Sequence, residues 1–217
     1  MSAPDGLVIT PDGAKVYVSS NNGDVVDVID TATDKVKGTV TVGTQPAGLS
    51  ITKDGKYVLA SVQGDGQAVI IDTVTDTVLG KSPVGKAHNS GLSPDGTLAF
   101  VASQVADAAA VDVVELPSGK AGATFALDAA PRAVFELGGK LYKTVAGSGD
   151  IEVLDATTGK KGASITTAGS PHDIRATLDG AFVLTVSQTA GELEVIDRRT
   201  ALTDRGRRAA RFHPEFG

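Results

Sequence analysis

Pro11-Asp12-Gly13 and, about eighteen residues later, Ile29-Asp30-Thr31 form a pair of marks that recurs along the chain and decides its fold. The turn mark returns as Lys53-Asp54-Gly55, Pro94-Asp95-Gly96, Gly138-Gly139-Lys140 and Leu178-Asp179-Gly180. The second mark returns as Ile71-Asp72-Thr73, Val114-Glu115-Leu116, Leu154-Asp155-Ala156 and Ile196-Asp197-Arg198. A unit of roughly 42 residues therefore fills most of the chain, and a period of this length built from short strands is typical of a β-propeller.

Each unit is predicted to contain four short strands. In the first unit, an apolar run leads into the Pro-Asp-Gly turn, and Lys15–Ser19 follows as a second strand. Asn21-Asn22-Gly23-Asp24 predicts a hairpin, because Asn and Gly accept a positive φ. Val25–Asp30 is the third strand, and Lys35–Val42 alternates as a half-exposed outer strand should. One large apolar side chain recurs four residues after the turn glycine, as packing between sheets requires: Tyr17, Leu59, Phe100 and Leu184.

The composition limits the function classes. The chain has 217 residues, no Cys and a net charge of −6, so disulfides and thiolate chemistry are excluded. An acidic body argues against general binding of nucleic acid, which depends on neutralising phosphates. Residues 198–217 carry six arginines against two carboxylates, and we expect this tail to be solvated or to contact an anion or acidic partner. Met1-Ser2-Ala3-Pro4 runs directly into the first unit, so no signal peptide is expected, and no apolar run is long enough to span a membrane.

The strings Val28–Val36, Val16–Ser19 and Val42-Gly43-Thr44-Gln45-Pro46 resemble the YVTN-type β-propeller repeat of YncE-like and surface-layer-associated proteins. The resemblance covers about residues 4–197. It implies an all-β propeller that acts outside the cytoplasm: periplasmic, cell-surface or secreted. It also implies seven blades, so the five units here predict either a five-bladed ring or part of a larger ring. An incomplete ring would expose two blade faces and favour self-association.

We expect one domain over residues 1–217, with blades at about 4–45, 46–86, 87–129, 130–169 and 170–211 and an Arg-rich tail at 198–217. The fifth unit lacks the alternating outer strand. Its residues 201–211 are predicted to be helical or frayed.

The best candidate site lies where each unit enters its innermost strand. The residue after the first strand position is Asp5, Ala47, His88, Arg132 or His172 in successive units. In a propeller these positions form a ring at the mouth of the central channel, so His88, Arg132 and His172 are predicted to converge there. Asp173 lies beside them, and Arg175 points the same way only if the strand is irregular.

Several interpretations of this site stay open. His88 and His172 with Asp173 could hold a metal ion or a haem edge, whereas Arg132 favours an anion or carboxylate. The plainer alternative is that each side chain hydrogen-bonds loop backbone. The acids of the second mark are predicted to cap turns, because they sit on separate blades and cannot act as a catalytic pair.

The sequence contains no hydrolase elbow, zinc-protease helix motif or phosphate loop, and no catalytic residue is predicted. The leading interpretation is a non-enzymatic module that binds a protein or small anionic ligand at the channel mouth. A metal-dependent lactonase- or lyase-like enzyme using His88 and His172 is one alternative. A noncovalent haem-binding propeller similar to cytochrome d1 is another.

Overall fold

The computed structural model describes residues 3–105, 107–145, 147–177, 179–199 and 202–203. These residues form five four-stranded antiparallel sheets, each with its strands in chain order. No helix of the described residues has the length and apolarity needed to cross a membrane. The all-β fold and the four-stranded blades are therefore confirmed, and the sheets are numbered here as blades 1 to 5.

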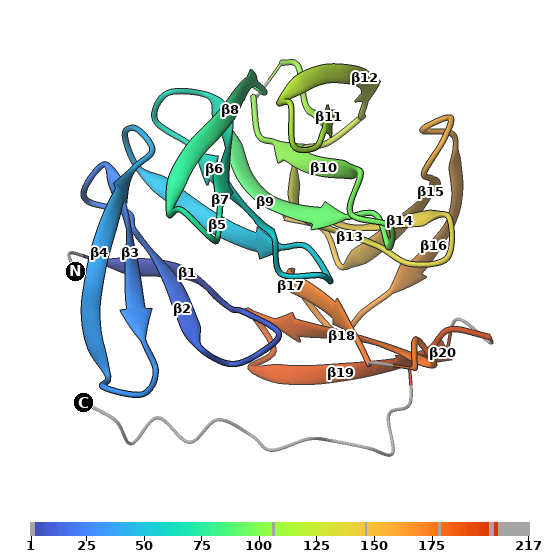
Figure 1. Cartoon of the computed structure of the whole chain (residues 1–217). Coiled ribbons are helices and arrows are strands. Elements are labelled where there is room, and N and C mark those ends of the chain that lie inside the picture. Colours follow the sequence, from blue (N-terminus) through green and yellow to red (C-terminus); the bar gives the residue numbers. More distant parts are fainter. Residues whose placement is uncertain (1–2, 106, 146, 178, 200–201, 204–217) are drawn as a thin grey trace. The chain divides into compact units, whose positions relative to one another are not determined.

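The chain divides into two compact units, Met1–Ala130 and Pro131–Gly217, which are described separately. Unit 1 holds blades 1 to 3, drawn in blue, cyan and green in Figure 1. Blade 1 contains β1 (Pro4–Ile9), β2 (Lys15–Ser20), β3 (Val25–Asp30) and β4 (Lys35–Thr41). Blade 2 contains β5 (Pro46–Ile51), β6 (Tyr57–Val62), β7 (Gln67–Asp72) and β8 (Thr77–Pro83). Blade 3 contains β9 (Ala87–Leu92), β10 (Leu98–Ser103), β11 (Ala110–Glu115) and β12 (Lys120–Ala126).

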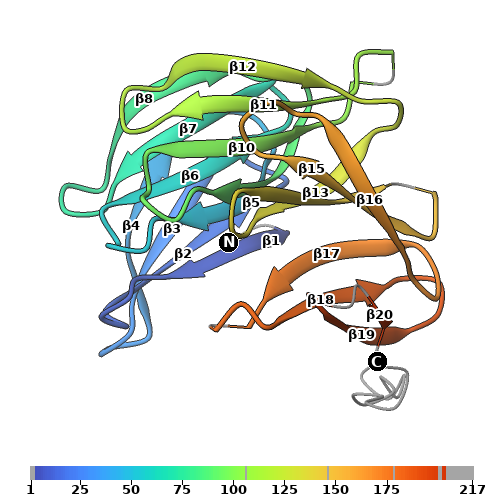
Figure 2. The ribbon, with the colours of Figure 1, turned by 90° about the vertical axis from the view of Figure 1, so that its right-hand side faces the viewer.

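Unit 2 holds blades 4 and 5, drawn in yellow and orange in Figure 2. Blade 4 contains β13 (Pro131–Glu136), β14 (Lys140–Val145), β15 (Asp150–Asp155) and β16 (Lys161–Thr166). Blade 5 contains β17 (Pro171–Ala176), β18 (Phe182–Ser187), β19 (Glu192–Asp197) and β20 (Leu202–Thr203). The expectation of a single domain over the whole chain stays a prediction.

The fifth blade corrects one expectation. Residues 201–211 were expected to be helical or frayed, yet Leu202–Thr203 pairs with β19, opposite Asp197 and Ile196. The rest of that segment, residue 201 and residues 204–211, lies outside the described residues. The outer strand of blade 5 therefore exists, and its described part is two residues long, against six or seven in the other blades.

The turn marks stabilise the first hairpin of blades 1, 2, 3 and 5 through one repeated set of contacts. Thr10 donates its hydroxyl to Asp12 at 2.6 Å, and Asp12 also accepts the backbone N–H of Ala14. The same contacts recur at Asp54, Asp95 and Asp179. The glycine of each such turn adopts a positive φ, +73° at Gly13, which a side chain would disfavour.

Apolar side chains fill the space between neighbouring blades. Tyr17, Val28, Val58 and Ile71 pack between blades 1 and 2, and Tyr142, Val153, Val183 and Ile196 pack between blades 4 and 5. The predicted packing position is buried in blades 1 to 3, where Tyr17, Leu59 and Phe100 are at most 2% exposed. Leu184 is only half-buried, which corrects that part of the prediction. Tyr142 occupies the position in blade 4 and is buried.

Candidate functional site

The candidate site residues His88, Arg132 and His172 are each the second residue of the first strand of their blade, β9, β13 and β17. All three are half-buried, and each makes contacts within the protein. His88 belongs to unit 1, and Arg132 and His172 belong to unit 2. The structure thus gives them equivalent places in their own sheets, and the convergence of all three stays a prediction.

A bulge follows directly after this position in every blade. Pro131 pairs with Val145, whereas Val134 pairs with Lys143, so β13 carries one extra residue between them. The same shift occurs in the other first strands, between Pro171 and Ile174 in β17 for example. A bulge interrupts strict alternation and re-aims the side chains beside it. The irregularity on which the placement of Arg175 depended is therefore present in β17.

One side-chain hydroxyl connects the bulges of neighbouring blades. Thr144 in β14 accepts the backbone N–H of Ala133 at 3.0 Å and donates to the carbonyl oxygen of His172 at 3.4 Å. Ser19 connects blades 1 and 2 in the same way, through Gly6 N–H and the Ala47 carbonyl. β13 therefore lies beside β17 (Figure 2), and Thr144 bonds both the residue after Arg132 and the backbone of His172.

Asp173 and Arg175 form an ion pair on β17. Arg175 Nη1 lies 2.9 Å from Asp173 Oδ1 and also donates to the Ile174 carbonyl. Both side chains are about half exposed, at 40% for Asp173 and 50% for Arg175. Arg175 is thereby held against Asp173, the neighbour of His172 in sequence, and a half-exposed arginine is suited to binding a carboxylate or phosphate.

The described residues contain no group of three or more His, Cys, Asp or Glu side chains arranged to hold a metal ion. In unit 2 the candidate site instead offers Arg132, His172 and Arg175 against one acid, Asp173. Guanidinium and imidazole N–H groups are hydrogen-bond donors, so the arrangement favours an anionic group over a bare cation.

The acids of the second mark have the structural role that was expected of them. Asp30, Asp72 and Asp155 each accept the backbone N–H groups two and three residues ahead, and Asp197 accepts that of Arg199. The backbone and hydroxyl hydrogen bonds from Thr158 and its neighbour hold the pKa of Asp155 below its ordinary value. Glu115 differs, since its carboxylate contacts Lys120 at 3.1 Å.

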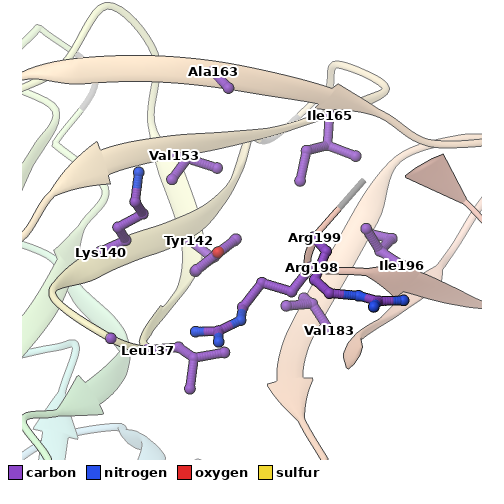
Figure 3. Close-up of a pocket in the computed structure, with 11 residues that line it drawn as sticks. Leu137, Lys140, Tyr142, Val153, Ala163, Ile165, Val183, Ile196, Arg198 and Arg199 are labelled. Atoms are coloured by element: carbon purple, nitrogen blue, oxygen red, sulfur yellow. The ribbon is translucent and has the colours of Figure 1, made fainter. Parts of the chain in front are cut away.

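The sequence reasoning missed two features of unit 2. Lys143 in β14 is fully buried, with its Nζ 2.6 Å from Glu152 Oε2. An open cleft lies between blades 4 and 5, lined by Tyr142, Lys140 and Arg198 among others (Figure 3). A signal for the cleft is present in the sequence. When the turns after Asp72 and Asp197 are aligned, Arg198 and Ala201 stand where blade 2 has Thr73 and Asp76.

The fold is that of a β-propeller, as solved structures show. The Kuenenia stuttgartiensis hydrazine synthase superposes with a TM-score of 0.79 at 22% identity, over 92% of this chain and 64% of that one. The Myceliophteria thermophila Cps50 (Swd1) β-propeller domain gives a TM-score of 0.77 at 14% identity, over 91% of this chain and 67% of that one. This chain thus spans about two thirds of the length of each. No protein-family model and no curated protein sequence matches it.

Proposed function

We propose that this chain is a non-enzymatic binding module of the YVTN, YncE-like type that takes an anionic ligand, or an acidic segment of a protein, at the starts of its innermost strands. The repeat markers support the family, and the propeller fold supports the architecture. The proposal also places the protein in the cell envelope or outside the cell, as the family resemblance implies.

The observation that carries the proposal is the paired placement of Arg132 and His172 in unit 2. The Thr144 hydroxyl connects the two strand starts, and the Asp173–Arg175 ion pair adds a second guanidinium on β17, the strand of His172. A rigid scaffold with donors at the strand starts needs no reorganisation to bind an anion. In the complete arrangement that we propose, His88 contributes from the equivalent position of β9.

Binding of citrate, a small polycarboxylate, provides a direct test. We expect citrate to bind to the purified chain, and Arg132→Gln and His172→Gln to weaken it by about twofold to fivefold each. Lys160→Gln removes an exposed cation of unit 2 away from the site and should leave binding unchanged. Equal affinity in all four proteins, measured by calorimetry, would remove the proposed site.

Purified chain also tests the two alternatives. Bound metal together with turnover, both lost in His172→Ala, would replace our proposal with a metal-dependent enzyme. A haem absorption band that depends on His172 would replace it with a haem-binding propeller. Sedimentation of the chain shows whether it self-associates, as an incomplete ring would.

A further inference from the structure

The interface between blades 1 and 2 shows how this repeat closes the space beside a buried tyrosine. The Tyr17 hydroxyl of β2 donates to Asp76, which lies in the turn after β7. Lys15 lies 2.9 Å from the same carboxylate and donates to the Thr73 carbonyl. Burial, reinforced by the hydrogen bond to Asp76, raises the pKa of Tyr17. One carboxylate from blade 2 therefore satisfies both polar groups of blade 1.

The interface between blades 4 and 5 has the same lysine and tyrosine positions, but the sequence has no carboxylate at the position of Asp76. Lys140 and Tyr142 stand where blade 1 has Lys15 and Tyr17, as the strand register shows. Arg198 stands at the position of Thr73, and the sequence has Ala201 at the position of Asp76. No described residue accepts a hydrogen bond from the Tyr142 hydroxyl or forms an ion pair with Lys140 or Arg198.

Three cationic residues, Lys140, Arg198 and Arg199, line this space. A methyl group added to Gly138 would lie 3.0 Å from Arg198 Nη1, which places this guanidinium against the turn before β14. Burial raises the pKa of Tyr142, and the charge of Arg198 acts in the opposite direction. Arg199 is held by Asp197 at 3.3 Å, and Asp155 is engaged with backbone N–H groups, so neither carboxylate substitutes for Asp76.

The outer strands also differ in residue type. Val78 of β8 pairs with Ile71 and packs against the core between blades 1 and 2, whereas β20 has Thr203 opposite Ile196. Unit 2 contains a cleft of about 320 Å³, with apolar walls from both blades and cationic residues in its lining (Figure 3). The walls are Val153, Ile165, Val183 and Ile196, and the cationic residues are Lys140, Arg198 and Arg199. Its volume lies at the lower end of the range for small-molecule sites.

We propose that this cleft binds a small amphiphilic carboxylate, with its anionic head taking the place that the Asp76 carboxylate occupies in unit 1 and its apolar body lying against the apolar walls of the cleft. Lys140, Arg198 and the Tyr142 hydroxyl donate to the head. Val153, Ile165, Val183 and Ile196 pack against the body. This site is separate from the strand starts at Arg132 and His172, so either proposal can fail alone.

Calorimetric titration of the whole chain with octanoate tests the chemistry. Octanoate should bind more tightly than octanamide, which lacks the charge, by about tenfold for two charge-assisted contacts. Affinity should rise from butanoate to octanoate by roughly fourfold for each methylene that becomes buried. Equal binding of octanoate and octanamide, or no binding at ~10 mM, would overturn the proposal.

Substitutions of residues that line the cleft test whether octanoate binds there. Lys140→Gln and Arg198→Gln should each weaken octanoate binding by about twofold to fivefold, with octanamide binding unchanged. Lys160→Gln is the matched control with no expected effect. Octanoate binding that none of these cleft variants alters would overturn the proposal.

Discussion

The interface between blades 1 and 2 and the interface between blades 4 and 5 use the same tyrosine on the same strand, but only the first contains an acid from the next blade. Tyr17 and Lys15 share Asp76. Tyr142 and Lys140 meet Arg198 in an open cleft. The apolar walls barely differ, because Val28, Val58 and Ile71 correspond to Val153, Val183 and Ile196 and all are buried. The two interfaces thus differ at two or three turn residues: Asp76 pairs with Lys15 and Tyr17 in unit 1, whereas Tyr142 lines a cleft in unit 2.

The buried ion pair of blade 4 should give the largest effect on stability. Burial opposes ionisation of Glu152, but hydrogen bonds from Lys143 and Lys161 outweigh it and hold the pKa of Glu152 below its ordinary value. Glu152→Ala leaves Lys143 buried without its closest partner and should lower the free energy of unfolding by about 3 kcal/mol in urea titrations.

The matched rescue copies blade 2, where Ala60 and Val69 pair at the same register. Lys143→Ala combined with Glu152→Val should recover most of that loss, since an apolar pair can replace a buried ion pair at little cost. A double variant no more stable than Glu152→Ala would show that Lys143 is not the reason for the loss.

Removing the Asp76 carboxylate, which pairs with Lys15 and Tyr17, tests the comparison directly. Asp76→Ala leaves the buried Tyr17 hydroxyl with only the long 3.4 Å contact to the Thr73 carbonyl and should cost about 2 kcal/mol. Asp34 is the control, because it occupies the same turn position in blade 1, shares the φ of +54° and accepts no hydrogen bond from a described residue. Equal losses of stability for Asp76→Ala and Asp34→Ala would contradict the role given to Asp76.

Removing the Ser19 hydroxyl, which connects the bulges of blades 1 and 2, should lower the free energy of unfolding by a smaller amount. Ser19→Ala removes both the acceptor of Gly6 N–H and a donor to Ala47, and should cost about 1 kcal/mol. Ser61 occupies the same place in blade 2, is fully buried and hydrogen-bonds no described residue. We therefore expect Ser61→Ala to be neutral or slightly stabilising in the same urea titrations, and the reverse order would sink this interpretation.

The turn aspartates should make the smallest contribution to stability, and it should be detected as a loss of stability at acidic pH. Hydrogen bonds from Thr52 and then from the Lys56 backbone lower the pKa of Asp54 from 3.8 to about 2. Because the folded-state pKa is depressed, the stabilisation is present above pH 3.8 and is lost as the pH falls through about 2.

Thermal melting at pH values from about 5 to about 2 measures this loss, and Asp54→Asn should show a shallower pH dependence than the parent. The matched variant Asp34→Asn, at a carboxylate with no hydrogen bond from a described residue, should follow the parent curve. Identical slopes for the parent and Asp54→Asn would exclude the proposed contribution.

The repeat could be predicted from sequence because its determinants are local. Turn glycines, hairpin Asn-Gly pairs and alternating strands each act within a few residues, and the innermost strands begin within a residue of where the pattern placed them. The same register correctly gave His88, Arg132 and His172 equivalent places in their strands.

The features that were missed depend on contacts between blades. Asp76 accepts a hydrogen bond from Tyr17, which is 59 residues away in sequence, so no local pattern marks it. Lys143 can be buried because Glu152 faces it across the hairpin. Leu184 fits the repeat pattern but is half-buried, because side-chain burial is set by the neighbouring sheet as well as by the blade itself.

Mapping the octanoate site by NMR tests the central comparison most directly. In ¹H–¹⁵N spectra of the whole chain, octanoate should shift the amide signals around Lys140, Tyr142, Ile165 and Arg198. The corresponding signals around Lys15, Tyr17 and Asp76 should stay in place, because the Asp76 carboxylate already pairs with Lys15 and with the Tyr17 hydroxyl. Shifts of equal size at both interfaces, or shifts confined to the interface between blades 1 and 2, would contradict the account.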